Sequence, residues 1–189
     1  MDAKDPRAAE VLAFWFGSGE RDKRWFEKNP AFDREIGARF LALHDQAGAG
    51  LLAHWQRTAA DCLALIVLLD QFSRNIYRGM ARAFAADALA LGAAQHAIGS
   101  GFDRSMQPVE RMFVYLPFEH AESLEEQVKA CELTKPLVEF PETADAYRYA
   151  VSHRDVIARF GRFPHRNVLL GRVSTPEEAE FLQRPGSRF

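Results

Sequence analysis

The sequence predicts an all-α protein, and three observations support that prediction. Apolar residues recur at helical spacing along most of the chain, and no segment alternates between apolar and polar residues as a half-buried strand does. Capping residues and helix breakers stand where helices of ordinary length would begin and end. No Pro/Ser-rich linker divides the 189 residues. We therefore expect one helical domain, residues 1–189, with about eight helices.

The two N-terminal helices begin with the same signal. The pair Asp5–Pro6 supplies an N-cap followed by proline at the first helical position, and Gly17 should end this helix. The pair Asn29–Pro30 repeats the signal, and Gly48 should close the second helix. The apolar stripe of the second helix is made by Phe32, Ile36, Phe40 and Leu43. Both helices are therefore predicted to be amphipathic.

The central helices differ from these in composition. Thr58 with Asp61 three residues later resembles a capping box. The helix that follows, CLALIVLLDQF, is apolar all round until Asp70, so we place it at the centre of the fold. An Ala-rich helix is expected next, over residues 81–98.

Four further signals organise the C-terminal half. Pro108 opens a helix that Pro117 should bend or break, because proline lacks a backbone donor. A second capping box is expected at Ser123 and Glu126, before a helix through residue 131. The next helix runs over residues 143–160, and a short last helix begins at residues 175–178.

Several classes of protein are excluded by composition. The chain has no N-terminal targeting pattern and no apolar stretch as long as a membrane span. Cys62 and Cys131 lie far apart without metal-ligand or redox spacing, so we expect both to be buried and reduced. A formal net charge of -2 gives no chain-wide field for nucleic acid. We therefore expect a cytoplasmic protein without a membrane or nucleic-acid partner.

The first of three polar segments is LDQFSRNIYRG, residues 69–79. Asp70 stands near the end of a central helix, where the helix dipole and burial both disfavour an anion. A cation must compensate it, and Arg74 is four residues on. A structural ion pair explains this segment as well as a binding site does.

The second segment, YLPFEHAE at residues 115–122, holds Glu119, His120 and Glu122. A carboxylate beside an imidazole is suited to general acid/base work, although a charged helix start explains the cluster equally well. His120 and Glu122 match the H-x-E half of the zinc deaminase signature, but P-C-x-x-C and H-E-x-x-H are both missing. No metal is therefore expected. No cofactor is expected either, since phosphate-binding and dinucleotide-binding glycine motifs are missing too.

The third segment, residues 153–172, concentrates positive charge. It holds five arginines and one acid, a formal charge of +4, whereas residues 119–145 carry eight acids and two lysines, a formal charge of -6. The two stretches could face each other. Arg162, His165, Arg166 and Asn167 crowd a turn, and converging guanidinium groups suit the capture of a carboxylate or phosphate. The bland alternative is that arginines at a helix C-terminus need no ligand.

The chain resembles a bacterial family known as domain of unknown function 924. The resemblance rests on VLAFWFG, RWF, LDQFSRNIYRG, FAAD, YLPFEHAE, RFGRFPHRN and STPEE, which together span nearly the whole chain. Ser73 departs from the proline that we associate with many relatives. The resemblance implies a tetratricopeptide-like right-handed superhelix of antiparallel helix pairs, and it implies no activity.

Three functions remain open. The first is a binding module for an anionic small molecule or a peptide carboxylate. The second is a metal-independent hydrolase or lyase acting on an anionic small molecule, and the third is a structural polar network without a ligand. The candidate catalytic residues are His120, Glu122 and His165. The candidate ligand-binding residues are Asp70, Gln71, Arg74, Asn75, Tyr115, His153, Arg162, Arg166 and Asn167.

Overall fold

The computed structural model of the chain describes residues 3–17 and 23–187, and within those ranges it contains helices and no strand. The all-α prediction is confirmed. The described α-helices are α1 (Pro6–Phe16), α2 (Pro30–Gly48), α3 (Ala59–Ile66), α4 (Ser73–Ile76), α5 (Asp87–Gly99), α6 (Pro108–His120), α7 (Leu124–Thr134), α8 (Ala146–Phe160) and α9 (Pro176–Phe181). A π-helical segment, Val67–Phe72, joins α3 to α4 without a break, so the described chain forms eight helices, as expected.

Most of the predicted helix starts are confirmed by their hydrogen bonds. The Asp5 side chain accepts from the Arg7 backbone N–H, and the Asn29 side chain accepts from two backbone N–H groups of α2. Thr58 caps α3, and Thr175 forms a complete capping box with Glu178 at the start of α9. Local sequence therefore fixes these ends.

Three local predictions were wrong. Residues 81–84 form a 3₁₀ turn, and α5 begins at Asp87, whose carboxylate is bound by two arginines from other parts of the chain. The α6 helix continues through Pro117, because burial of residues 112–119 outweighs one missing backbone donor. Ser123 precedes α7 without a capping hydrogen bond from its side chain.

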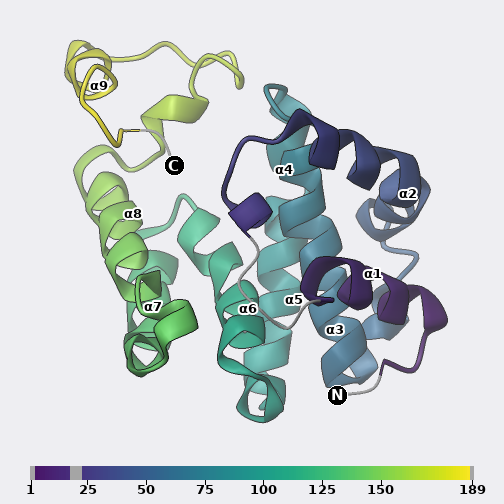
Figure 1. Cartoon of the computed structure of the whole chain (residues 1–189). Helices are drawn as coiled ribbons and strands as arrows, with labels where there is room; N and C mark the ends of the chain where they lie inside the picture. Colours follow the sequence, from purple (N-terminus) through teal and green to yellow (C-terminus); the bar gives the residue numbers. More distant parts are fainter. Residues whose placement is uncertain (1–2, 18–22, 188–189) are drawn as a thin grey trace.

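The helices pack in sequence order around α3. This helix contacts α1, α5 and α6, and the later helices pair successively as α5 with α6, α6 with α7, and α7 with α8. Figure 1 shows α1 and α2 on one side of the molecule and α7 and α8 on the other. The superhelical arrangement implied by the family resemblance remains a prediction.

One large apolar core holds these helices together. Its aromatic part includes Trp15, Trp25, Phe72 and Phe113, whose rings meet edge to face or stacked at 4.9–5.9 Å. Cys62 and Cys131 are both buried and free, which confirms that they form no disulfide. Among the described helices, none combines the length and apolar character needed to cross a bilayer.

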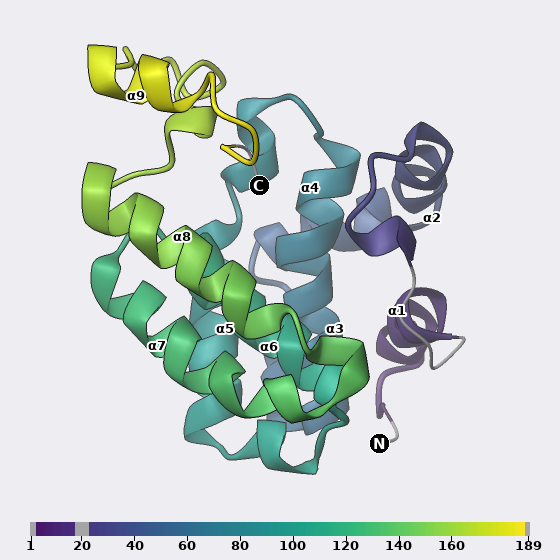
Figure 2. The same ribbon diagram turned by 60° about the vertical axis from the view of Figure 1, so that its left-hand side comes forward.

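The C-terminal segment, residues 161–187, packs differently from the rest of the chain. Its buried apolar side chain Phe163 joins Val156 and Ile157 of α8 in a small separate cluster, with Phe160 and Phe181 at the edge. Figure 2 shows this segment, including α9, at one end of α8. Polar contacts therefore carry much of its attachment, and it forms one wall of the site described below.

Candidate functional site

A cavity of about 880 Å³ opens between the helical core and the C-terminal segment. Its walls come from α4, α6 and α8, from the 3₁₀ turn Lys23–Trp25, and from residues of the C-terminal segment. A volume of this size is in the range of small-molecule binding sites. Segments that are far apart in the sequence thus share one hollow.

The π-helical segment brings a charged group into the centre of the fold. Asp70 has no solvent-exposed surface, and its neighbour Gln71 is buried as well. A wider helical turn inserts extra residues into a continuous helix, and such π segments are often found at functional sites. Here the segment places Asp70 directly behind the cavity wall that Gln71 and Arg74 help to form.

Asp70 and His120 form a hydrogen-bonded dyad. The His120 Nδ1 donates to Asp70 Oδ1 at 2.7 Å, while Gln71 Nε2 donates to Oδ2 at 2.6 Å and Arg74 Nη1 lies 3.1 Å from Oδ1. Burial acts to raise the pKa of Asp70, but the charge of Arg74 and the contact with His120 hold that pKa below its usual range. Asp70 is therefore an anion with three partners.

The same contacts set the state of His120. Burial lowers the pKa of His120, and the nearby Arg74 charge lowers it further, so the ring is neutral at pH 7. Since Nδ1 carries the proton that Asp70 accepts, Nε2 carries a lone pair. No described residue is hydrogen-bonded to Nε2, and His120 lines the cavity. The arrangement presents an unprotonated imidazole nitrogen to a ligand.

Glu119, next to His120 on α6, lies in a contrasting environment. It is 1% exposed and lines the cavity; its backbone carbonyl accepts from Gln127, but its carboxyl group makes no hydrogen bond to any described residue. Its closest ionisable neighbour is His153, with 3.7 Å between Glu119 Oε2 and His153 Nδ1, and that Nδ1 donates to the Tyr149 carbonyl at 2.9 Å. Burial, together with the charge of Asp70, raises the pKa of Glu119 to about 8. Glu119 is therefore a neutral acid at pH 7.

Five arginines line the cavity, and each is bound to an acid; the two most buried of them are Arg74 and Arg166. Arg74 makes a two-point contact with Asp87 at 3.0 and 3.3 Å in addition to its contact with Asp70. Arg166 Nη1 donates to Asp87 Oδ2 at 3.0 Å, and its Nη2 donates to the His120 carbonyl at 3.0 Å. The two guanidinium groups are thus balanced by two carboxylates, which leaves no net positive charge at this end of the cavity.

Aromatic rings hold Arg166 in place. Its guanidinium lies 4.5 Å from the Phe84 ring centre and 4.6 Å from that of Phe163. Burial, with the neighbouring Arg74 charge, lowers the pKa of Arg166 to about 10, so the group stays charged at pH 7. His165 also lines the cavity, and burial lowers the pKa of this histidine to about 4.

The structure gathers most of the predicted site residues at this cavity. Asp70 lies directly behind the wall, bonded to His120. The predicted residues that line the cavity are Gln71, Arg74, Asn75, His120, His153, His165 and Arg166. Asn75 is held by a hydrogen bond from its Nδ2 to Asp33 at 2.8 Å.

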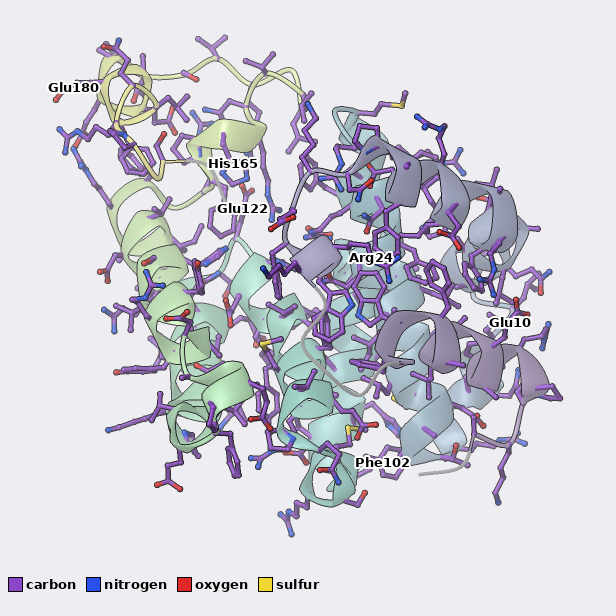
Figure 3. All side chains as sticks on the ribbon, viewed as in Figure 1. Glu10, Arg24, Phe102, Glu122, His165 and Glu180 are labelled. Atoms are coloured by element: carbon purple, nitrogen blue, oxygen red, sulfur yellow. The ribbon has the colours of Figure 1, made fainter. Side chains whose placement is uncertain are left out.

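Four predicted site residues lie elsewhere, because each has found a protein partner. Glu122 binds Arg172 and the Phe163 backbone N–H, and Figure 3 shows Glu122 below His165 of the C-terminal segment. Arg162 makes a two-point contact with Glu178, and Asn167 donates to the same carboxylate. Tyr115 donates to Asp103 at 2.8 Å. None of the four lines the cavity; they attach neighbouring segments to one another.

Sequence reasoning missed three features of the site. Glu119 was grouped with its charged neighbours and not singled out, although it directly precedes His120. Asp87 and Phe84 belong to the FAAD motif, which supports the family resemblance but did not suggest a role for either residue.

In the part of the chain that the structure describes, no three His, Cys, Asp or Glu side chains come together as a metal site would require.

Comparison with known proteins places the chain. The model of the family described as bacterial protein of unknown function (DUF924) matches residues 11–186. The chain belongs to this family. The chain is 42% identical to a protein of unknown function from Agrobacterium tumefaciens whose structure has been solved. The two structures align with a TM-score of 0.87, over 94% of this DUF924 chain and 97% of the Agrobacterium chain. No curated protein matches the chain.

Proposed function

We propose that the cavity is an enzyme active site in which His120 acts as a general base. The observation that carries the proposal is the buried Asp70–His120 dyad, whose free Nε2 belongs to a cavity of about 880 Å³. A carboxylate that binds Nδ1 fixes the imidazole tautomer and stabilises the imidazolium formed after proton transfer. Asp70 is then a positioning residue, and His120 is the group that meets the substrate.

The reaction class follows from what surrounds the base. No described hydroxyl or thiol is hydrogen-bonded to His120 Nε2, so the base would remove a proton from water or from the substrate itself. The first route gives hydrolysis and the second gives elimination. Arg166 donates to the His120 carbonyl and so helps to hold the base in position.

The charge balance bears on the ligand. The sequence predicts an anionic ligand held by arginines, and that prediction is untested. Arg74 and Arg166 are neutralised by Asp70 and Asp87, and the other arginines that line the cavity are each paired with an acid. A ligand therefore does not need to be anionic to match the site. This balance is the reason that we prefer a substrate without a carboxylate or phosphate.

A panel of chromogenic model substrates tests the proposal. Aryl esters, aryl amides and substrates that release a phenol by elimination would be assayed between pH 5 and 8. At least one should be converted, with a rate that rises with pH and levels off near neutrality, because the pKa of His120 lies below that of a free imidazole. His120→Gln should lower that rate by about 10² or more.

Two further variants complete the experiment. Asp70→Asn should lower the rate and change its pH profile, because the altered partner no longer fixes the tautomer. His54→Gln, at a histidine outside the cavity, is the matched control and should keep the wild-type rate. Conversion of no substrate by the wild-type protein, or an unchanged rate in His120→Gln, would overturn the proposal.

A further inference from the structure

Glu119 is the feature of the cavity that the proposed mechanism does not use. Its side chain is 2% exposed and lies at the cavity wall, and it makes no hydrogen bond to a described residue. A buried polar group without a partner costs free energy, so it calls for a functional explanation. The ligand itself is the natural partner, since the cavity is the space that the carboxyl group borders.

The groups around Glu119 favour a ligand that donates hydrogen bonds. The Nε2 of His120 is an acceptor, because Asp70 holds the proton on Nδ1. Glu119 itself accepts through both oxygens once ionised. The ionisable groups close enough to affect it are Asp70, His153 and the thiol of Cys131, and none of them is a cation at pH 7. Arg154, whose charge acts on the Cys131 thiol, is engaged by Asp155.

The rest of the wall suits an organic cation. Aromatic rings form a large part of it and offer the faces over which ammonium groups bind. The aromatic side chains that line the cavity are Trp25, Phe26, Phe84, Tyr149, Phe160 and Phe181. The protein already uses three of these faces in this way, since Arg166 lies over Phe84, Arg159 over Phe160 and Arg148 over Tyr149.

We infer that the substrate class of this site is a small organic amine, bound as an ammonium ion between the Glu119 carboxylate and His120 Nε2 with its apolar body against the aromatic wall. This inference rests on the proposed function only for the identity of the site. Binding removes the proton from Glu119 and releases it to the solvent, so that a buried carboxylate pairs with a buried cation. Arg74 and Arg166 do not oppose the ligand, because Asp70 and Asp87 balance their charges.

Three probes of similar shape and different charge test the inference by titration calorimetry at pH 7. These are phenethylamine, 2-phenylethanol and phenylacetate. We expect phenethylamine to bind more tightly than the other two by a factor on the order of 10 or more. Calorimetry in buffers of different ionisation enthalpy should report the release of about 0.9 proton per phenethylamine, since the pKa of Glu119 is about 8.

The variants identify the group responsible. Glu119→Gln should weaken phenethylamine binding by a factor on the order of 10 to 100 and abolish the proton release. Glu122→Gln is the matched control, because it neutralises a carboxylate three residues away that lies outside the cavity and binds Arg172. Equal or tighter binding of phenylethanol or phenylacetate, or unchanged phenethylamine binding in Glu119→Gln, would overturn the inference.

The two proposals fail in distinguishable ways. Phenethylamine binding that depends on Glu119, with no conversion of any model substrate, leaves the amine site and removes the general base. Conversion that depends on His120, without phenethylamine binding, leaves the base and removes the amine site. Unfolding of each variant in urea shows that a loss of binding comes from a folded protein.

Discussion

The Asp70 region on the π-helical segment and the Glu119 region at the end of α6 differ in partners and not in burial. Both residues are at most 1% exposed. Asp70 has a guanidinium, an imidazole and an amide around it and is ionised, whereas the Glu119 carboxyl group has no hydrogen bond to a described residue and is neutral. The comparison shows that partners decide the charge of a buried acid. It also assigns different roles to the two acids: Asp70 positions other residues of the site, and Glu119 is the proposed partner of a ligand.

Removal of the paired acid, Asp70, should have the largest effect on stability. Asp70→Ala leaves the largely buried Arg74 and His120 without a shared anion, so we expect the free energy of unfolding to fall by about 3–5 kcal/mol. Urea unfolding followed by circular dichroism measures this loss. Asp45→Ala, at a half-exposed carboxylate paired with Arg82, is the control and should cost no more than about 1 kcal/mol. Equal losses in both variants would contradict the assigned difference.

The pH dependence of stability should report on the buried histidines next to the two acids. Burial lowers the pKa of His153 to about 3 and that of His165 to about 4. Below pH 6.5 these two histidines are protonated in the unfolded chain but stay neutral in the folded chain. The free energy of unfolding therefore falls as the pH decreases toward the folded-state pKa values. Between pH 6 and 5 each histidine should remove about 1 kcal/mol. His153→Gln should make the decline shallower, and an unchanged slope would be evidence against the buried neutral ring.

Replacing the unpaired acid, Glu119, with glutamine should change the free energy of unfolding in the opposite direction to removing Asp70. With a pKa of about 8 for Glu119, the unfolded chain releases this proton from about pH 4.5 upward while the folded chain retains it. The contribution of Glu119 to wild-type stability therefore falls from about pH 4.5 to pH 8. Glu119→Gln removes that term, and we expect it to raise the unfolding free energy at pH 8 by about 1–2 kcal/mol. A destabilised variant would show that Glu119 has an unrecognised protein partner.

The smallest effect is expected at a residue that belongs to neither region. Arg162 binds Glu178 and the Val173 carbonyl on the outside of the C-terminal segment. Arg162→Ala should loosen that segment, seen as faster amide exchange around residues 173–178, and change phenethylamine affinity by less than about twofold. A larger change in affinity would return Arg162 to the site in which sequence reasoning placed it.

The sequence accounts for the parts of the fold that depend on neighbouring residues. Asp5, Asn29, Thr58 and Thr175 predict helix starts correctly, because an N-cap acts on backbone groups two or three residues away. The start of α5 could not be predicted in this way. That helix begins at Asp87, which binds Arg74 and Arg166, 13 and 79 residues away.

The same distinction divides the candidate site. The motifs marked Asp70, His120 and Arg166 as unusual by residue type alone, and the structure brings all three together. Arg162 and Glu122 have the same kinds of side chain, yet they are paired with Glu178 and Arg172. Side-chain type predicts which residues need partners, whereas the fold selects the partner.

By itself the sequence determined the helical class, most of the helix ends and the supply of charged groups, since these follow from interactions within a few residues. Only the tertiary structure decided which charges cancel, that Asp70 is ionised and that the Glu119 carboxyl group lies beside a cavity without a hydrogen-bond partner among the described residues. The physical reason is that the pKa of a buried group depends on every charge and donor within a few ångströms, and those neighbours come from segments about 50 residues apart along the chain.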